Sequence, residues 1–412
     1  MLVDRRNFLK NTAGGVLAAA GGLVLPKHVF GASPTTNLNE LPAGTVASAV
    51  LESLPGKRPL IKRSYRPPNF ETPVEYFNEI FTPNDAFFVR YHLSNIPEVS
   101  ADSWRLKIGG DAAQKPFELT LEQLKRDFEQ VEIAAVCMCS GNRRGLSVPH
   151  VPGVEWAHGA MGNARWKGVR LRDVLNKAGI AKETVEVAFD GSDRGVLDAT
   201  PDFVKSIPAW KALDENTLIA YEMNGAPLPH WNGFPARIIV PGWTATYWMK
   251  HVTSITLLTQ PFKGFWVNTA YRIPKGKFPI TQQFVSQENE TTTPITEMVV
   301  NSLITNLKPN QTFRLGQPVV VKGIAWDSGY GIRLVEVSTD GGMTWRDAQL
   351  EKDYGRFSWR QWSYAFKPSK KGSYSVLAKA SNSQGASQTF EWIFNAAGYH
   401  NNVVQQIAIA VT

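Results

Sequence analysis

Residues 133–145 of this chain read Ile133-Ala134-Ala135-Val136-Cys137-Met138-Cys139-Ser140-Gly141-Asn142-Arg143-Arg144-Gly145. The first four are a short apolar run, which predicts a buried strand. Ser140, Gly141 and Asn142 favour a turn, so the strand should end at Cys139. Its end would then present a thiol beside two guanidinium groups, whose positive charge favours the thiolate, the form of cysteine that binds soft metals or acts as a nucleophile. The structural alternative is a pair of inert buried cysteines followed by surface arginines.

The composition is that of a globular protein and excludes several other classes. Of 412 residues, 43% are hydrophobic and 19% charged, which excludes a disordered or coiled-coil chain. Cys137 and Cys139 are the only cysteines, and a disulfide between them would close a very small, strained ring. We find no Cys-x-x-Cys-His motif and therefore expect no haem on this chain. The formal charge of +8 includes +3 in the first 32 residues, and the remaining +5 or so suits an anionic substrate and predicts no nucleic-acid partner.

A second segment alternates between its two faces and reads Phe87-Phe88-Val89-Arg90-Tyr91-His92-Leu93. Such alternation predicts a strand with Phe88, Arg90 and His92 on one side. An arginine two residues from a histidine on a strand suits an anion clamp. Taken alone, an arginine such as Arg90 more often has a structural role, in which its charge is paired with another side chain.

A third segment, residues 224–250, is rich in loop-forming residues around one short strand. It contains Asn-Gly-Ala-Pro-Leu-Pro at 224–229, Gly-Phe-Pro-Ala-Arg at 233–237 and Trp-Met-Lys at 248–250. Backbone N–H groups and guanidinium groups in such loops can bind a phosphorylated ligand. Each residue alone would be ordinary turn chemistry.

The first 32 residues carry the pattern of an export signal. Arg5 and Arg6 precede an uncharged stretch over residues 11–26, and small residues follow at 31–32. The stretch is shorter than the ~20 apolar residues that span a bilayer. It resembles a twin-arginine signal, which predicts a periplasmic protein with no stable membrane insertion after export. An uncleaved membrane anchor is the alternative.

The rest of the chain divides into three parts by composition and periodicity. Residues 33–80 predict an extended N-terminal arm, and residues 81–290 predict a catalytic domain in which short strands alternate with short helices, such as 171–178 ended by Gly179. Residues 295–412 predict short strands about ten residues apart, with a hairpin turn at 340–342, typical of an immunoglobulin-like sandwich. The predicted fold class is therefore α+β, a mixed α/β domain followed by an all-β sandwich.

The three segments together resemble the sulfite oxidase family of molybdenum–pterin enzymes. The strings that carry the resemblance are Phe-x-Arg-x-His, Cys-x-Gly-Asn-Arg-Arg, Asn-Gly-x-Pro-Leu-Pro and Gly-Phe-Pro-x-Arg, in that order. The resemblance extends over roughly residues 70–400, and the sandwich is similar to the family's dimerisation domain. The twin-arginine pattern makes exported bacterial sulfite dehydrogenases the most similar branch.

This resemblance implies an activity and partners. The activity is oxidation of sulfite to sulfate at a molybdenum–molybdopterin centre, with electrons passed one at a time to a c-type cytochrome. The partners are sulfite, that cytochrome, and either a second copy of the chain or a cytochrome subunit.

The same resemblance assigns roles to individual residues. Cys139 is the implied molybdenum ligand. The implied catalytic residues are Arg90, His92, Arg144, Tyr271 and Trp156. The implied cofactor-binding residues are Phe88, Val89, Arg90, Tyr91, His92, Cys139, Asp193, Asn232, Arg237, Trp248, Met249 and Lys250. The family often has histidine at the position of Asn232, and Cys137 receives no role.

Two other functions remain open on the sequence alone. A periplasmic oxo-transfer reductase, for instance of methionine sulfoxide, would use the same cofactor, but such reductases lack the sandwich and the Asn-Arg-Arg string. A non-enzymatic immunoglobulin-like binding protein would explain residues 295–412 but not the string that begins at Cys139. Molybdenum content distinguishes this last alternative from the enzymes.

Overall fold

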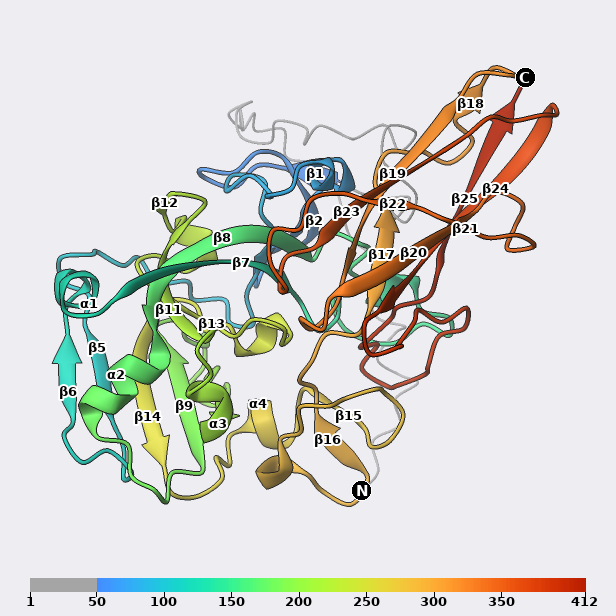
Figure 1. The fold of residues 1–412 in the computed structure, drawn as a ribbon. Helices are drawn as coiled ribbons and strands as arrows, with labels where there is room; N and C mark the ends of the chain where they lie inside the picture. The colour runs from blue at the N-terminus through green and yellow to red at the C-terminus, as the bar shows by residue number, and fades with distance from the viewer. Residues whose placement is uncertain (1–49) are drawn as a thin grey trace, which may run out of the picture. The chain divides into compact units, whose positions relative to one another are not determined.

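Strands dominate the part of the chain that the computed structural model describes, residues 50–412 (Figure 1). The predicted export signal, residues 1–32, and the first part of the predicted arm lie outside the described residues. Within residues 50–412, no helix has both the length and the apolar character needed to cross a membrane.

The N-terminal described segment is folded into a sheet. The sequence predicts an extended arm here, but residues 50–71 form three antiparallel strands that pair with a fourth: β1 (Val50–Glu52), β2 (Leu60–Ser64), β3 (Asn69–Glu71) and β4 (Val89–Arg90). Leu60, Phe70 and Val89 are fully buried in a small core of their own. β1–β3 are only three to five residues long, which is too short for their periodicity to be read from the sequence.

Two larger sheets form the body of the mixed domain. The first has the order β10 (Lys205–Pro208), β9 (Glu186–Gly191), β14 (Val252–Leu258), β5 (Leu106–Gly109), β6 (Phe117–Leu119), with β14 and β5 parallel. The second is antiparallel, with the order β12 (Ala226–Pro227), β11 (Leu218–Met223), β8 (Met161–Arg170), β7 (Gln130–Met138), and β13 (Arg237–Ile239) also pairs with β11. The predicted strand at 133–136 is the centre of β7.

Helices are few and short in the described chain. They are α1 (Leu121–Asp127), α2 (Leu171–Ala178), α3 (Ala209–Ala212) and α4 (Phe265–Asn268), with 3-10 turns η2 (Val74–Asn78), η3 (Arg144–Leu146), η4 (His230–Asn232), η5 (Ala245–Tyr247) and η6 (Val285–Gln287). α2 is the helix predicted at 171–178, and it ends as predicted because Gly179 adopts a left-handed conformation. Thr120 caps α1 through a reciprocal pair of hydrogen bonds with Gln123.

The C-terminal part is a sandwich of two sheets, preceded by a small hairpin of β15 (Arg272–Pro274) and β16 (Thr292–Pro294). One sheet has the order β17 (Asn301–Ile304), β19 (Val319–Trp326), β23 (Arg360–Phe366), β22 (Gln349–Leu350). The other has the order β18 (Thr312–Phe313), β25 (Gln405–Val411), β24 (Gly372–Asn382), β20 (Ile332–Ser338), β21 (Arg346–Asp347). β20 and β21 pair across the predicted turn at 340–342.

Buried contacts join the mixed domain to the sandwich. Val136 and Met138, near the end of β7, share one apolar cluster with Trp326 and Trp359 of the sandwich. The backbone N–H of Val136 also donates to the carbonyl of Phe357 at 2.9 Å. The strand that ends at the cysteine motif is therefore anchored to the sandwich.

Candidate active site

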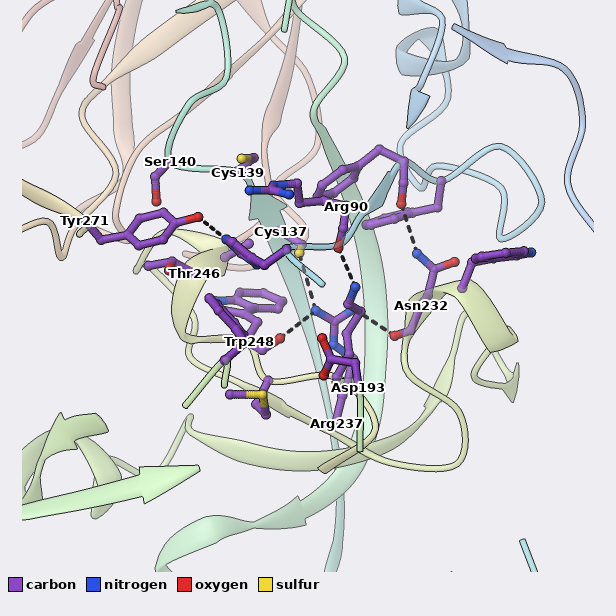
Figure 2. A pocket seen from close by; sticks show the side chains of 18 residues that line it. Arg90, Cys137, Cys139, Ser140, Asp193, Asn232, Arg237, Thr246, Trp248 and Tyr271 are labelled. Atoms are coloured by element: carbon purple, nitrogen blue, oxygen red, sulfur yellow. Dashed lines mark hydrogen bonds between the residues drawn. The ribbon is translucent and has the colours of Figure 1, made fainter. Parts of the chain in front are cut away.

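A cavity forms where β7 and β4 end beside the loops that follow β9, β12 and α4 (Figure 2). Its space, including the part open to solvent, is about 640 Å³, within the range of small-molecule and cofactor sites. Its wall consists of Phe87, Phe88, Arg90, His92, Cys137, Cys139, Ser140, Asp193, Phe203, Trp231, Asn232, Arg237, Ala245, Thr246, Trp248, Met249, Lys250 and Tyr271.

β7 brings both thiols to this wall. Cys137 and Cys139 are two positions apart, so strand geometry turns them to the same side. Burial raises the pKa of Cys137 to about 11, which keeps that thiol protonated. The turn after Cys139 is fixed because the backbone N–H of Asn142 donates to the Cys139 carbonyl at 3.0 Å. The Ser140 hydroxyl donates to Thr244 Oγ1 at 2.9 Å.

The two arginines of the motif do not line the cavity. Arg143 is buried and directed into the sandwich, where it donates to Asn301 Oδ1 at 2.9 Å and to the Val403 carbonyl at 2.7 Å. Arg144, predicted as part of the anion pocket, donates to the carbonyls of Ala397 and Val154 at 2.6 and 3.2 Å. Residues far along the chain supply most of these acceptors, so the local sequence could not reveal them.

Arg144 is enclosed by glycines. A Cβ atom at Gly141 would lie 2.5 Å from its guanidinium group, and one at Gly153 would lie 2.8 Å away. A Cβ at Gly398 would lie 2.6 Å from the aliphatic part of the same side chain. The glycine of the Ser-Gly-Asn turn is therefore required by close packing against Arg144.

The predicted strand at 87–93 is reduced to β4, which has only two residues, and the side chains alternate from Phe88 onward, since both Phe87 and Phe88 line the cavity. Arg90 and His92 line it, while Val89 and Tyr91 face the opposite side and pack in the small N-terminal core. The Tyr91 hydroxyl lies 2.6 Å from His251 Nε2. Val89 and Tyr91, which the sequence predicts as cofactor-binding residues, therefore lie behind the cavity wall. Trp156, predicted as a pocket wall, is fully buried in the main core and is also outside the cavity wall.

Tyr271 reaches the cavity from the loop after α4 and hydrogen-bonds to Nε2 of His92. Its backbone has φ of 61°, an uncommon conformation for a bulky residue and typical of functional sites. Burial raises the pKa of Tyr271 and, together with the charge of Arg90, holds the pKa of His92 well below its usual range. Both side chains are therefore neutral near pH 7, with the phenol donating to the imidazole nitrogen. The ring of Tyr399, from the sandwich, stacks on Tyr271 at 5.7 Å.

The opposite end of the cavity is rich in positive charge (Figure 2). Arg237 donates to the Asn232 carbonyl at 2.9 Å, to the Trp248 carbonyl at 3.1 Å and to Cys137 Sγ at 3.9 Å. Lys250 donates to the carbonyl of Arg90. None of these acceptors is a carboxylate. Burial lowers the pKa of both cations.

Asp193 is the single carboxylate among the wall residues of this cavity. Burial raises its pKa, and the nearby charge of Lys250 opposes that shift. Arg90, Arg237 and Lys250 outnumber it, so the wall carries net positive charge when Lys250 is protonated. Such a wall favours an anionic ligand.

Eleven of the predicted site residues therefore meet in one cavity, and Val89, Tyr91, Arg144 and Trp156 lie behind it. Seven wall residues were not predicted: Phe87, Cys137, Ser140, Phe203, Trp231, Ala245 and Thr246. Cys137 and Ser140 lie within the cysteine motif, where the two-residue period of a strand could have indicated Cys137. Phe203 and Thr246 carry no local signal.

The chemistry of the wall fits a metal on an anionic organic cofactor. Cys139 offers a soft donor at one end, and the guanidinium and ammonium groups at the other suit a phosphorylated group. Two buried wall atoms, Arg237 Nε and Thr246 Oγ1, have no hydrogen-bond partner among the described residues. Buried polar atoms are rarely left without partners, so both are suited to a polar ligand.

Sequence comparisons define the class of protein. Residues 92–266 match the family described as oxidoreductase molybdopterin binding domain, and residues 292–412 match the Mo-co oxidoreductase dimerisation domain. Fold and site therefore define a molybdopterin-binding oxidoreductase, and the predicted order of a mixed domain followed by a β-sandwich is confirmed.

The chain belongs to the sulfite oxidase family. It is 32% identical to the mitochondrial sulfite oxidase of Drosophila melanogaster, over 99% of this chain and 76% of the fly protein. It is 34% identical to sulfite oxidase of Gallus gallus, over 87% of this chain and 83% of the other. Against the human mitochondrial enzyme the identity is 36% over 75% of this chain, but the match spans only 57% of the human protein.

A solved structure supports the same fold. The sulfane dehydrogenase SoxCD from Paracoccus pantotrophus superposes with a TM-score of 0.71 at 25% identity, over 84% of this chain and 85% of that chain. The match therefore includes the mixed domain and the sandwich together.

Proposed function

We propose that this protein oxidises sulfite to sulfate with a molybdenum–molybdopterin cofactor held in the cavity. The reaction converts sulfite and water to sulfate, two protons and two electrons. The observation that carries the proposal is the meeting of Cys139 with Arg90, His92 and Tyr271 in one wall. Sulfite oxidases make up most of the relatives reported above, which favours sulfite over other substrates.

Residues at the two ends of the cavity would hold the cofactor. Cys139 Sγ would bind the metal, and Arg237, Lys250 and Asn232 would hold the anionic end of the pterin. When bound, the cofactor supplies the oxygen transfer and the two-electron change. In the cofactor-free chain the Cys137 thiol is protonated, because burial raises its pKa to about 11.

The chain's own residues would bind and orient sulfite. Sulfite is a strongly hydrated anion, and fixed donors must replace its water. The Arg90 guanidinium supplies permanent positive charge at the wall. The Tyr271 phenol is neutral and can donate a hydrogen bond to a bound anion. When no anion is bound, the phenol donates to Nε2 of His92. Arg144 would act on sulfite only from behind the wall residues, because its guanidinium donates to the carbonyls of Ala397 and Val154.

The electrons would leave one at a time to a c-type cytochrome in the periplasm. The sequence supports this proposal through its twin-arginine pattern and its lack of a haem-attachment motif. The dimerisation-domain match supports assembly with a second copy of the chain, and a cytochrome subunit is the alternative partner.

The test is reduction of ferricytochrome c by the purified protein with and without sulfite. We expect sulfite-dependent reduction that Cys139→Ser abolishes and that Cys137→Ser, a matched thiol two positions away, largely retains. Arg90→Gln should raise KM for sulfite, and an unchanged KM would remove Arg90 from the binding site. Absence of reduction by protein that contains molybdenum would contradict sulfite oxidation and favour a reductase with another oxo-transfer substrate. Reduction of oxygen as fast as of any cytochrome would contradict the proposed acceptor.

One observation favours a second substrate. Arg144 does not line the cavity, so Arg90 is the one arginine at the thiol end of its wall. Together with the likeness to a sulfane dehydrogenase, this favours a more reduced sulfur atom as the group oxidised. Parallel assays with sulfite and with a persulfide distinguish the two, and a higher kcat/KM for the persulfide would replace sulfite as the substrate.

A further inference from the structure

Lys57 is a buried cation behind the cofactor end of the cavity. It lies in the turn between β1 and β2, outside residues 92–266 that match the molybdopterin-binding family. Its side chain is 7% exposed. Its ammonium group donates to the carbonyls of Asn84 and Phe87 at 2.6 and 3.0 Å, and to Asn232 Oδ1 at 2.5 Å.

Packing alone does not explain an ammonium group at this position. All three acceptors are neutral, and a buried charge with neutral partners is destabilised by desolvation. Burial accordingly lowers the pKa of Lys57 to about 7. The carboxylate of Asp85 acts on this ammonium group by its charge, but Asp85 is partly exposed and is paired with Arg58 at 2.8 Å. A neighbouring anion would remove this penalty.

Asn232 connects Lys57 to the cavity wall. Its Oδ1 accepts from Lys57, its Nδ2 donates to the Phe88 carbonyl at 3.1 Å, and its backbone carbonyl accepts from Arg237 at 2.9 Å. The amide is therefore held in one orientation by protein groups on both sides. A change at Lys57 would reach Arg237 through this single residue.

We propose that Lys57 is a positioning residue for the anionic end of the pterin cofactor. Its ammonium group fixes Asn232 and adds a third positive charge to those of Arg237 and Lys250, against the one carboxylate of Asp193. The ligand class is a phosphorylated group. The inference rests on the cofactor proposed for this cavity, but it does not depend on which substrate the enzyme oxidises.

The experiment measures cofactor retention in purified holoprotein. Lys57→Met keeps the aliphatic packing but removes the charge and the donors, whereas Lys57→Arg keeps both. Asn232→Leu breaks the link from the other side. Arg58→Met is the matched control, because Arg58 is the next residue and is exposed. Molybdenum and pterin per mole of folded protein are measured on purification and at intervals after dilution and gel filtration.

We expect Lys57→Met to lose cofactor about tenfold faster than the wild type, the scale of one hydrogen bond to a charged group. Asn232→Leu should lose cofactor at least as fast, because Asn232 also lines the cavity, and the double variant should be no faster than the faster single variant. Lys57→Arg should retain more cofactor than Lys57→Met, and Arg58→Met should behave as the wild type. A role in packing alone would leave Lys57→Met unchanged.

Equal loss rates for the wild type and Lys57→Met would overturn the inference and leave the proposed function intact. Wild-type protein that takes up no molybdopterin would instead contradict the proposed function. If Lys57→Met does not fold, Asn232→Leu decides, because a wild-type loss rate in that variant also excludes the coupling. Equal impairment in Lys57→Met and Lys57→Arg, in parallel with lower thermal stability, would reduce Lys57 to a structural residue.

Discussion

Raising the pH should stabilise the cofactor-free protein, and Lys57 should account for a measurable part of the gain. Its pKa is about 7 in the folded protein and 10.5 as an ordinary lysine. Between these values the unfolded chain keeps the proton and the folded chain releases it, so unfolding takes up a proton. Stability therefore rises with pH by about 1.4 kcal/mol per unit in this window, and is flat with respect to Lys57 below pH 7.

Summed over pH 6.5 to 9.5, this linkage amounts to about 3 kcal/mol in the free energy of unfolding. Urea unfolding of the cofactor-free wild type and of Lys57→Met at four pH values isolates the contribution of Lys57. The buried Lys205 and Lys250 also have lowered pKa values, but both proteins contain them, so their contributions cancel in the comparison. The wild type should gain about 3 kcal/mol more than the variant across this range, and Arg58→Met should keep the wild-type slope. Parallel slopes for the wild type and Lys57→Met would refute the reasoning.

Three further outcomes follow from the geometry of the site. Cys139→Ser should keep the pterin but lose molybdenum, and an unchanged molybdenum-to-pterin ratio by mass spectrometry and fluorescence would exclude Cys139 as the ligand. Tyr271→Phe should lower kcat/KM for sulfite on the order of 100-fold, the effect of one removed donor, with an unaltered circular dichroism spectrum; a change within twofold argues against a donor role. Gly141→Ala places a Cβ 2.5 Å from the Arg144 guanidinium and should cost about 1–3 kcal/mol in urea unfolding, unlike Gly109→Ala, where the nearest atom is 3.8 Å away. Equal stability of the two alanine variants would contradict the glycine enclosure of Arg144.

Local periodicity was enough to predict the parts of the site that lie on strands. The extended segment from Phe88 to His92 places Arg90 and His92 in the cavity, because successive residues of an extended chain point to opposite sides, although only Val89 and Arg90 pair as β4. The same rule correctly places the thiol of Cys139 at the end of β7. It also shows why Val89 and Tyr91, included in the predicted cofactor set as neighbours, lie behind the wall. Contiguity in sequence is a poor guide to a shared surface on a strand.

The parts that could not be predicted depend on contacts between distant segments. The direction of Arg143 is set by Asn301 and Val403, more than 150 residues away. Tyr399 stacks on Tyr271 only because the sandwich packs against the mixed domain. Lys57 lies in a segment that the sequence predicts as a surface arm, and no periodicity marks its short strands. Tertiary packing decides each of these positions.

The two ends of the cavity differ in charge, and this difference suits one end to the cofactor and the other to the substrate. At the cofactor end, Arg237 and Lys250 are buried beside neutral acceptors, which favours a resident anion that stays bound. At the thiol end, His92 and Tyr271 are neutral and Arg90 is the cation of the wall, while Arg144 is held outside it. A substrate anion and its product carry similar charge, so strong fixed charge at that end would hold the product as firmly as the substrate. Neutral donors avoid this, because they orient the bound anion while permitting it to leave.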